Sequence, residues 1–171
     1  DGALQINPDR APVENLDDLP FPAYDLIRHD LYKMPYTNGN FLLVATGRGC
    51  PHPCTFCADH TYYGKKLRLR SAKNLVDELE HWGKAYGIRE FLFWSEGFTL
   101  SPPRAKAVAR EIAARGLDIE WVCNSRVDDV DPEMLELFRK AGCNIIGFGV
   151  ESGVQSMLDA MKKGTTVEQI R

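Results

Sequence analysis

Four short apolar runs, each followed by a segment with helical periodicity, constrain the fold of this chain more than any other feature. The runs are residues 41–46, 91–94, 119–123 and 144–150. Successive strands that are joined by helices have to be parallel, with right-handed crossovers. The runs are apolar throughout rather than alternating, which predicts strands that are covered on both faces. The pattern therefore predicts an α/β fold with a parallel sheet, either open or part of a barrel.

The helices between these runs have recognisable ends. Ser71 is expected to cap a helix that continues to Tyr86 and stops at Gly87, because serine favours N-caps and glycine favours the left-handed position after a helix. The dipeptides Ser101-Pro102 and Asp131-Pro132 each combine a capping residue with a proline at the first helical position. Each of the first three runs is thus followed by a helix.

The last part of the sequence predicts a fourth unit and the start of another. A helix is expected over residues 154–163. Thr165 and Glu168 then match the capping-box pattern Thr-x-x-Glu, which predicts a further helix start. The sequence stops three residues later, at Arg171. We therefore expect a chain truncated after four β/α units.

Residues 1–40 differ from the rest of the chain. Prolines recur through this segment and interrupt any long helix. It has no apolar pattern that would give it a core of its own. We expect an irregular arm or linker over residues 1–40, lying on a domain formed by residues 41–171.

Composition excludes several classes of protein. The net charge of -3 argues against a nucleic-acid partner held by bulk electrostatics. No apolar run approaches the roughly 20 residues of a membrane span, and the first residues do not form a signal-peptide pattern. The odd number of cysteines, five, is unlike a secreted disulfide scaffold. These features predict a cytoplasmic protein.

Three of the cysteines are clustered directly after the first predicted strand. Cys50, Cys54 and Cys57 form a C-x₃-C-x₂-C pattern. Thiolates are the usual ligands of iron–sulfur clusters, and three of them leave the fourth iron of a [4Fe–4S] cubane without a protein ligand. A catalytic metal needs such an open position. Active sites of parallel α/β folds also lie at the carboxyl ends of strands. The loop therefore predicts a catalytic cluster.

A zinc site is the alternative interpretation of the same loop. His52 or His60 would complete a tetrahedral Cys₃His site, in a protein that is a non-catalytic zinc-binding domain. Zinc ribbons usually need two ligand pairs far apart, and only one compact group is present. Cys123 and Cys143 lie in or beside predicted strands and are expected to be small buried side chains. The spacing favours iron–sulfur over zinc.

Polar residues follow the other three strands at the same edge of the predicted sheet. Ser95 and Glu96 follow the second strand, Ser125 and Arg126 the third, and Glu151 the fourth. Carboxyl ends of parallel strands share one edge, so these side chains are expected near the cysteine loop. Each also has a plainer interpretation, as a solvated loop residue, the start of a turn or a helix cap.

The motif C-x₃-C-x-aromatic-C, with Phe56 as its aromatic residue, resembles the signature of the radical S-adenosylmethionine superfamily. The resemblance covers about residues 41–171 and implies a partial TIM-type barrel of parallel β/α repeats, with four of six units present. It implies a [4Fe–4S] cluster on the three cysteines and reductive cleavage of S-adenosylmethionine to a 5′-deoxyadenosyl radical, which abstracts hydrogen from a substrate. It also implies cofactor contacts at these positions: Phe56, Ser95, Glu96, Ser125, Arg126 and Glu151.

A narrower resemblance points to the cobalamin-dependent branch of that family, which includes methyltransferases and oxidative cyclases. It rests on residues 16–26 and on the segments 142–144, 149–153 and 161–166. That branch usually has an acid where Ser95 stands. The resemblance implies a small-molecule substrate, an electron donor such as flavodoxin or ferredoxin, and cobalamin bound by a domain outside this chain. A methylthiotransferase is the alternative, although residues 1–40 lack the additional cluster cysteines of that branch. We expect weak or no turnover from this chain alone.

Overall fold

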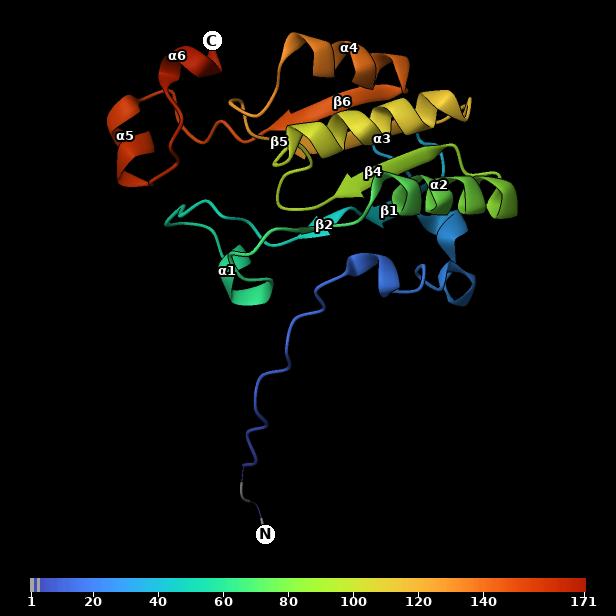
Figure 1. Cartoon of the computed structure of the whole chain (residues 1–171), viewed down its shortest axis with the longest axis horizontal. Coiled ribbons are helices and arrows are strands. Elements are labelled where there is room, and N and C mark those ends of the chain that lie inside the picture. Colours follow the sequence, from blue (N-terminus) through green and yellow to red (C-terminus); the bar gives the residue numbers. More distant parts are fainter. Residues whose placement is uncertain (1, 3) are drawn as a thin grey trace.

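The predicted strands form one parallel sheet in the computed structural model, which describes residue 2 and residues 4–171 (Figure 1). Each neighbouring pair of strands is parallel, and the order in the sheet is β1-β4-β5-β6. The strands are β1 (Phe41–Ala45), β4 (Glu90–Trp94), β5 (Glu120–Ser125) and β6 (Cys143–Phe148). Strands that follow one another in both chain and sheet are typical of successive units of a β/α barrel, so the predicted α/β partial barrel is confirmed.

Three long helices cover one face of this sheet (Figure 1). They are α2 (Ala72–Tyr86), α3 (Pro102–Ala114) and α4 (Pro132–Lys140). The predicted ends of α2 are confirmed: the Ser71 hydroxyl accepts a hydrogen bond from the Asn74 amide at 3.0 Å, and Gly87 follows the helix at φ 65°. The local sequence thus predicts both ends of α2 at the correct residues.

The elements after β6 differ from the prediction. Strand β6 ends at Phe148, before the predicted residue 150, and α5 (Gln155–Ala160) ends before the predicted residue 163. Lys162 and Gly164 have φ angles of 53° and 75°, and this left-handed backbone ends the helical path.

The predicted capping box is displaced by one residue. The Thr166 side chain, not that of Thr165, accepts from the Gln169 amide, and the Gln169 side chain accepts in return, at the start of α6 (Val167–Ile170). Thr165 is instead buried, with 2% of its surface exposed. The pattern predicted the helix correctly but not its first residue, because two adjacent threonines compete for one cap.

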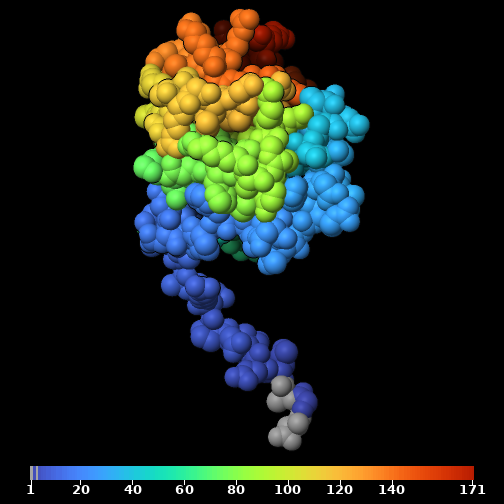
Figure 2. Space-filling view, turned by 90° about the vertical axis from the view of Figure 1, so that its right-hand side faces the viewer, coloured from blue at the N-terminus to red at the C-terminus, as the bar shows by residue number. Residues whose placement is uncertain are grey.

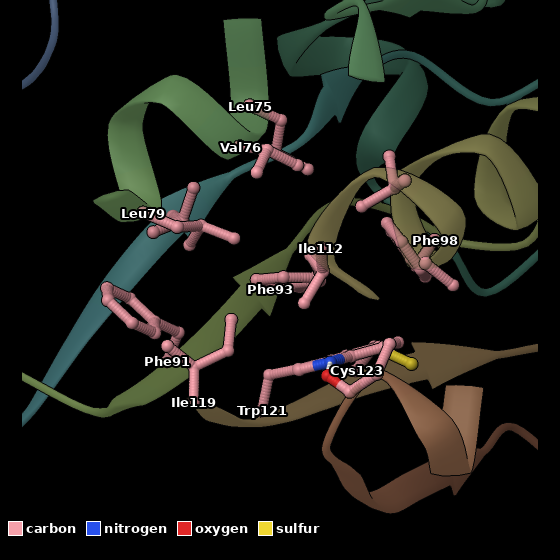
Figure 3. Close-up of a cluster of buried hydrophobic side chains, with 14 of the residues drawn as sticks. Leu75, Val76, Leu79, Phe91, Phe93, Phe98, Ile112, Ile119, Trp121 and Cys123 are labelled. Carbon is pink, nitrogen blue, oxygen red and sulfur yellow. Dashed lines mark hydrogen bonds between the residues drawn. The ribbon is translucent and has the colours of Figure 1, made fainter. Parts of the chain in front are cut away.

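The core lies between the sheet and the three helices, and aromatic rings fill its centre (Figure 3). Phe93 from β4 stacks on Trp121 from β5 with ring centroids 4.6 Å apart, and Phe98 and Phe138 pack edge-on or tilted around them. The Trp121 indole N–H donates to the Ala141 carbonyl at 2.7 Å, so its polar atom is satisfied inside the core. This packing fixes β4 and β5 relative to each other.

The opposite face of the sheet is more open than the sequence predicts. Side chains on this face include Leu43, which is 38% exposed, and Trp94, which is 56% exposed. The expectation that every strand is covered on both faces is therefore wrong for this chain. Four strands do not close into a barrel, so the face that would line a barrel interior is left partly exposed.

Residues 13–40 form an arm that packs along the free edge of β1. Residues 4–12 are exposed and extend away from the body (Figure 2). The next part contains three short 3₁₀ turns, η1 (Leu16–Asp18), η2 (Tyr24–Leu26) and η3 (His29–Leu31). The Phe41 amide donates to the Tyr32 carbonyl at 3.3 Å, and the Tyr24 hydroxyl donates to the Leu43 carbonyl. The arm thereby satisfies backbone groups of an edge strand. None of the helices described here has the length and apolar character that crossing a membrane requires.

Candidate functional site

The loop that carries the three cysteines leaves the sheet at the carboxyl end of β1 (Figure 1). Its entry and exit are joined by a short antiparallel pair, β2 (Gly47–Arg48) and β3 (Arg68–Leu69). Helix α1 (Asp59–Tyr62) lies within it. A side chain at Gly49 would place its Cβ 2.2 Å from the Lys66 carbonyl oxygen, and Gly49 has φ 87°. Only glycine fits where the two ends of the loop approach this closely.

The thiols differ in exposure and in contacts. Cys50 and Cys54 are half-buried and Cys57 is exposed, and all three are free. The Cys57 thiol donates to a carboxylate oxygen of Asp59 at 3.1 Å. Burial raises the pKa of Cys50 and of Cys57. As the side chains stand, no three Cys, His, Asp or Glu side chains in the described part of the chain are arranged to hold a metal ion.

The histidines of the zinc alternative have other contacts. The His60 ring is hydrogen-bonded through Nε2 to the Cys50 carbonyl oxygen at 3.0 Å, which supports the backbone of the loop. Burial lowers the pKa of His52, and the nearby Arg126 guanidinium lowers it further. Both histidines therefore lie at the loop, one against its backbone and one beside a cation.

Glu96 offers the clearest unsatisfied group at this edge of the sheet. Its Oε2 atom is buried and has no hydrogen-bond partner among the described residues, and the same holds for the hydroxyl of its neighbour Ser95. Burial is the main cause of the raised pKa of Cys50, and the Glu96 carboxylate is one of the charges that raise it further, which indicates that Glu96 lies within electrostatic range of the loop. A buried carboxylate oxygen without a donor suits a cationic ligand.

Ser125 and Arg126 are brought to the same edge, but their polar atoms contact the protein. The Ser125 hydroxyl pairs with the Thr99 hydroxyl at 2.5 Å and donates to the Arg126 carbonyl at 2.8 Å. The Arg126 guanidinium binds both carboxylate oxygens of Asp128, at 2.9 and 2.8 Å, and donates to the Lys163 carbonyl at 2.9 Å. Arg126 thus joins the end of β5 to the segment after α5.

Glu151 and Phe56 meet a residue that the sequence analysis did not single out. Glu151 has φ 62° and accepts a hydrogen bond from the Lys163 ammonium at 3.0 Å. Phe56 is 51% exposed, so it does not pack in the core, and the Lys163 nitrogen lies 5.9 Å from its ring centroid. The sequence carries no signal for this role, because Lys162 and Lys163 are adjacent and chemically identical.

A parallel β/α sheet whose first strand leads into a three-cysteine loop at its carboxyl edge is the arrangement of a β/α barrel domain with its site at that edge. The family described as the radical SAM superfamily matches residues 44–171. This chain belongs to the radical SAM superfamily.

Relatives of known name resemble the chain over nearly all of its length. An uncharacterized methyltransferase of Pyrococcus horikoshii is 35% identical over 168 residues, which are 98% of this chain and 36% of the relative. The anaerobic magnesium-protoporphyrin IX monomethyl ester cyclase of Rubrivivax gelatinosus is 32% identical over 171 residues, which are 99% of this chain and 30% of that enzyme. The chain therefore spans about a third of the length of these relatives.

A solved structure resembles the fold closely. It is the radical S-adenosylmethionine methyltransferase TsrM of Kitasatospora setae, with cobalamin and a [4Fe-4S] cluster bound. The TM-score is 0.72 at 25% sequence identity, over 78% of this chain and 28% of TsrM. The resemblance to the cobalamin-dependent branch, stated above from sequence motifs, is thus found in a three-dimensional fold as well.

Proposed function

We propose that this chain is the part of a radical enzyme that holds a [4Fe–4S] cluster on Cys50, Cys54 and Cys57 and binds S-adenosylmethionine beside it. The observation that carries the proposal is the placement of three thiols on one loop at the carboxyl edge of the sheet, near Glu96, one of whose carboxylate oxygens is buried without a partner among the described residues. The donor set suits the cofactor, because thiolates are the usual cluster ligands and three of them leave one iron open.

The contacts of the side chains at this site support a specific role for each of them. Loss of the thiol proton from Cys57 would break its hydrogen bond to Asp59 and free the sulfur as a ligand. Glu96 Oε2 would accept a hydrogen bond from the amine of the methionine moiety, which removes the cost of leaving that oxygen buried and unpaired. Ser95, which stands beside it, would contribute a hydroxyl donor or acceptor.

The remaining predicted contacts define the walls of the site. When bound, the cluster supplies the electron that cleaves S-adenosylmethionine to a 5′-deoxyadenosyl radical. The exposed ring of Phe56 offers an apolar surface for the adenosyl group. Ser125 and Arg126 shape the edge through their contacts with the protein, and Glu151 lies at the end of β6. The apolar face around Leu43 and Trp94 would offer a contact surface to a small-molecule substrate.

The relatives indicate the reaction class of the whole protein. We propose a methyltransferase or oxidative cyclase that uses cobalamin bound by a domain outside residues 1–171, with a flavodoxin or ferredoxin as electron donor. Free thiols at all five cysteines support a reducing, cytoplasmic location. Residues 1–40 as a linker arm and residues 41–171 as the core domain are part of the same proposal. A methylthiotransferase would share the cluster loop and remains distinguishable by its product.

Anaerobic reconstitution with iron and sulfide tests the proposal directly. We expect about four irons and four sulfides per chain, with a brown absorbance that the Cys57→Ala variant loses. S-adenosylmethionine should alter the EPR signal of the reduced cluster. One tightly bound zinc and no iron would refute the proposal and support the zinc-binding alternative.

A further inference from the structure

A turn near the end of the chain contacts the cysteine loop directly. The turn comprises residues 161–164, between α5 and α6, and we call it the 161–164 turn. The Thr55 amide donates to the Met161 carbonyl at 3.0 Å, and the Thr55 hydroxyl lies 3.4 Å from the same oxygen. These residues are 106 positions apart in the sequence. The middle of the cysteine loop therefore rests on the segment that follows the last strand.

Lys163 is the centre of this contact. Its side chain is only 7% exposed, and its ammonium lies 3.0 Å from Glu151 and 5.9 Å from the centre of the Phe56 ring. A buried ammonium is costly unless it is paired. Its carbonyl oxygen accepts from Arg126, which ties the turn to the end of β5. One residue thus contacts the cysteine loop, the end of β6 and the end of β5.

The backbone conformation leaves room for the ion pair of Lys163 and Glu151. A Cβ atom at Gly149 would lie 2.9 Å from Glu151 Oε1 and 3.0 Å from the Lys163 nitrogen. Glu151 and Lys162 both adopt positive φ angles, 62° and 53°, which non-glycine residues rarely do. Such strain persists where surrounding contacts fix the backbone and is typical of functional positions.

We propose that Lys163 is a positioning residue: through the 161–164 turn it holds the cysteine loop, and within that loop Phe56, against Glu151 at the end of β6. That these residues then face S-adenosylmethionine rests on the function proposed above. The fixing of the loop does not, because it follows from contacts that are present without any cofactor. Lys163 acts through Phe56 and Glu151 rather than on the reacting atoms.

The chain contains a matched control for this proposal. Lys162 is adjacent, carries the same charge and is exposed, and its side chain forms no hydrogen bond or ion pair with the described residues. Lys163→Met and Lys162→Met therefore change the net charge equally, and only the first removes the buried contact. Lys163→Arg restores a cation at the buried position.

Amide hydrogen exchange of the cofactor-free chain tests the fixing of the loop. In Lys163→Met we expect the Thr55 amide to exchange about tenfold faster than in the wild type, the usual scale for loss of one net hydrogen bond. Amides in β5 should be unchanged, and Lys162→Met should behave like the wild type. Equal exchange of Thr55 in Lys163→Met and Lys162→Met would overturn the proposal.

Gly149→Ala provides a second variant if Lys163→Met does not fold. It retains both charges and displaces the pair, because its methyl group meets both partners. The same selective increase in Thr55 exchange is expected. An unchanged Thr55 amide in a folded Gly149→Ala protein would count against the proposal.

The reconstituted protein tests the effect on cofactor binding. We expect Lys163→Met to retain the cluster and to bind S-adenosylmethionine about tenfold more weakly, as judged from the EPR change. Loss of a residue that orients the direct ligands of a site has an effect of at least this size. Lys163→Arg should recover most of the affinity, and Lys162→Met should lose none. Equal affinity in the two methionine variants would refute the positioning role.

The two readouts separate this inference from the proposed function. A wild-type chain that binds no cluster, combined with faster Thr55 exchange in Lys163→Met, would refute the proposed function and leave the fixing of the loop supported. A wild-type chain that binds the cluster, combined with unchanged Thr55 exchange in Lys163→Met, would support the proposed function and refute the fixing of the loop.

Discussion

Replacing Arg70 with methionine should destabilise the domain strongly at neutral pH and much less at acidic pH. Arg70 donates to Glu78 and also to the Ala45 carbonyl, 3.0 Å away at the end of β1. The Glu78 side chain is fully buried, and its other carboxylate oxygen has no partner among the described residues. Arg70→Met leaves this carboxylate without its counterion, inside the core beneath the strand that leads to the cysteine loop.

The size of the effect follows from the protonation of Glu78. Burial raises the pKa of Glu78, and the Arg70 guanidinium opposes this effect. Removing Arg70 therefore raises the pKa of Glu78 further. A glutamate of ordinary pKa about 4.3 costs about 4 kcal/mol to protonate at pH 7.5, at 1.36 kcal/mol per pH unit. Breaking a buried ion pair costs about 3–5 kcal/mol, so both approaches give the same magnitude.

The sign of the pH dependence is also fixed. Because the folded-state pKa of Glu78 lies above its unfolded value, the destabilisation is absent below the unfolded pKa and grows as the pH rises toward the folded pKa. Between pH 7.5 and pH 5.5 the protonation cost falls by about 2.7 kcal/mol. Because the wild type already bears part of this cost, Arg70→Met should lose up to about 4 kcal/mol at pH 7.5 and no more than about 2 kcal/mol at pH 5.5.

Urea unfolding at the two pH values, followed by circular dichroism, measures both quantities. Lys73→Met is the control, because it breaks an exposed ion pair between Lys73, whose side chain is 77% exposed, and Asp77. It should lower the free energy of unfolding by no more than about 0.5 kcal/mol. Adding Glu78→Gln to Arg70→Met should remove the pH dependence. The same loss for Arg70→Met at both pH values would show that the charge of Glu78 is not the cause, and the reasoning would fail.

Three further predictions test the site and the fold. Glu96→Gln should weaken binding of S-adenosylmethionine to the reconstituted chain at least about tenfold, because a charge-assisted hydrogen bond is lost. Titration calorimetry measures this affinity, and an unchanged value would contradict the prediction. Gly142→Ala should lower the free energy of unfolding in urea by at least about 2 kcal/mol. The reason is that Gly142 has φ 87° and that a Cβ would lie 2.0 Å from the Ile119 carbonyl oxygen. A loss of less than about 1 kcal/mol would contradict this prediction. Asp131→Ala should cost about 1 kcal/mol by removing the cap on the Met134 amide, 2.8 Å away; Asp131→Asn should keep most of that stability, and an equal loss in both variants would exclude the cap as the cause.

The sequence by itself determined the features that depend on neighbouring residues. Ser71 and Gly87 end a helix through their own hydrogen bond and φ angle, and both were predictable without any tertiary contact. Apolar runs separated by helices determined a parallel sheet, because a helical crossover allows no other direction. The spacing of Cys50, Cys54 and Cys57 determined a three-thiol loop and, by position, its place at the carboxyl edge.

Only the tertiary structure decided how the side chains at that edge are used. Ser125 and Glu96 both follow strands, yet the Ser125 hydroxyl is hydrogen-bonded to Thr99 while a Glu96 oxygen is buried without a partner. Lys162 and Lys163 are identical in sequence terms, and only Lys163 is buried against the cysteine loop. The physical reason is range: helix ends and loop spacing depend on residues a few positions apart, whereas the burial of one lysine depends on a loop that lies about a hundred positions earlier in the chain.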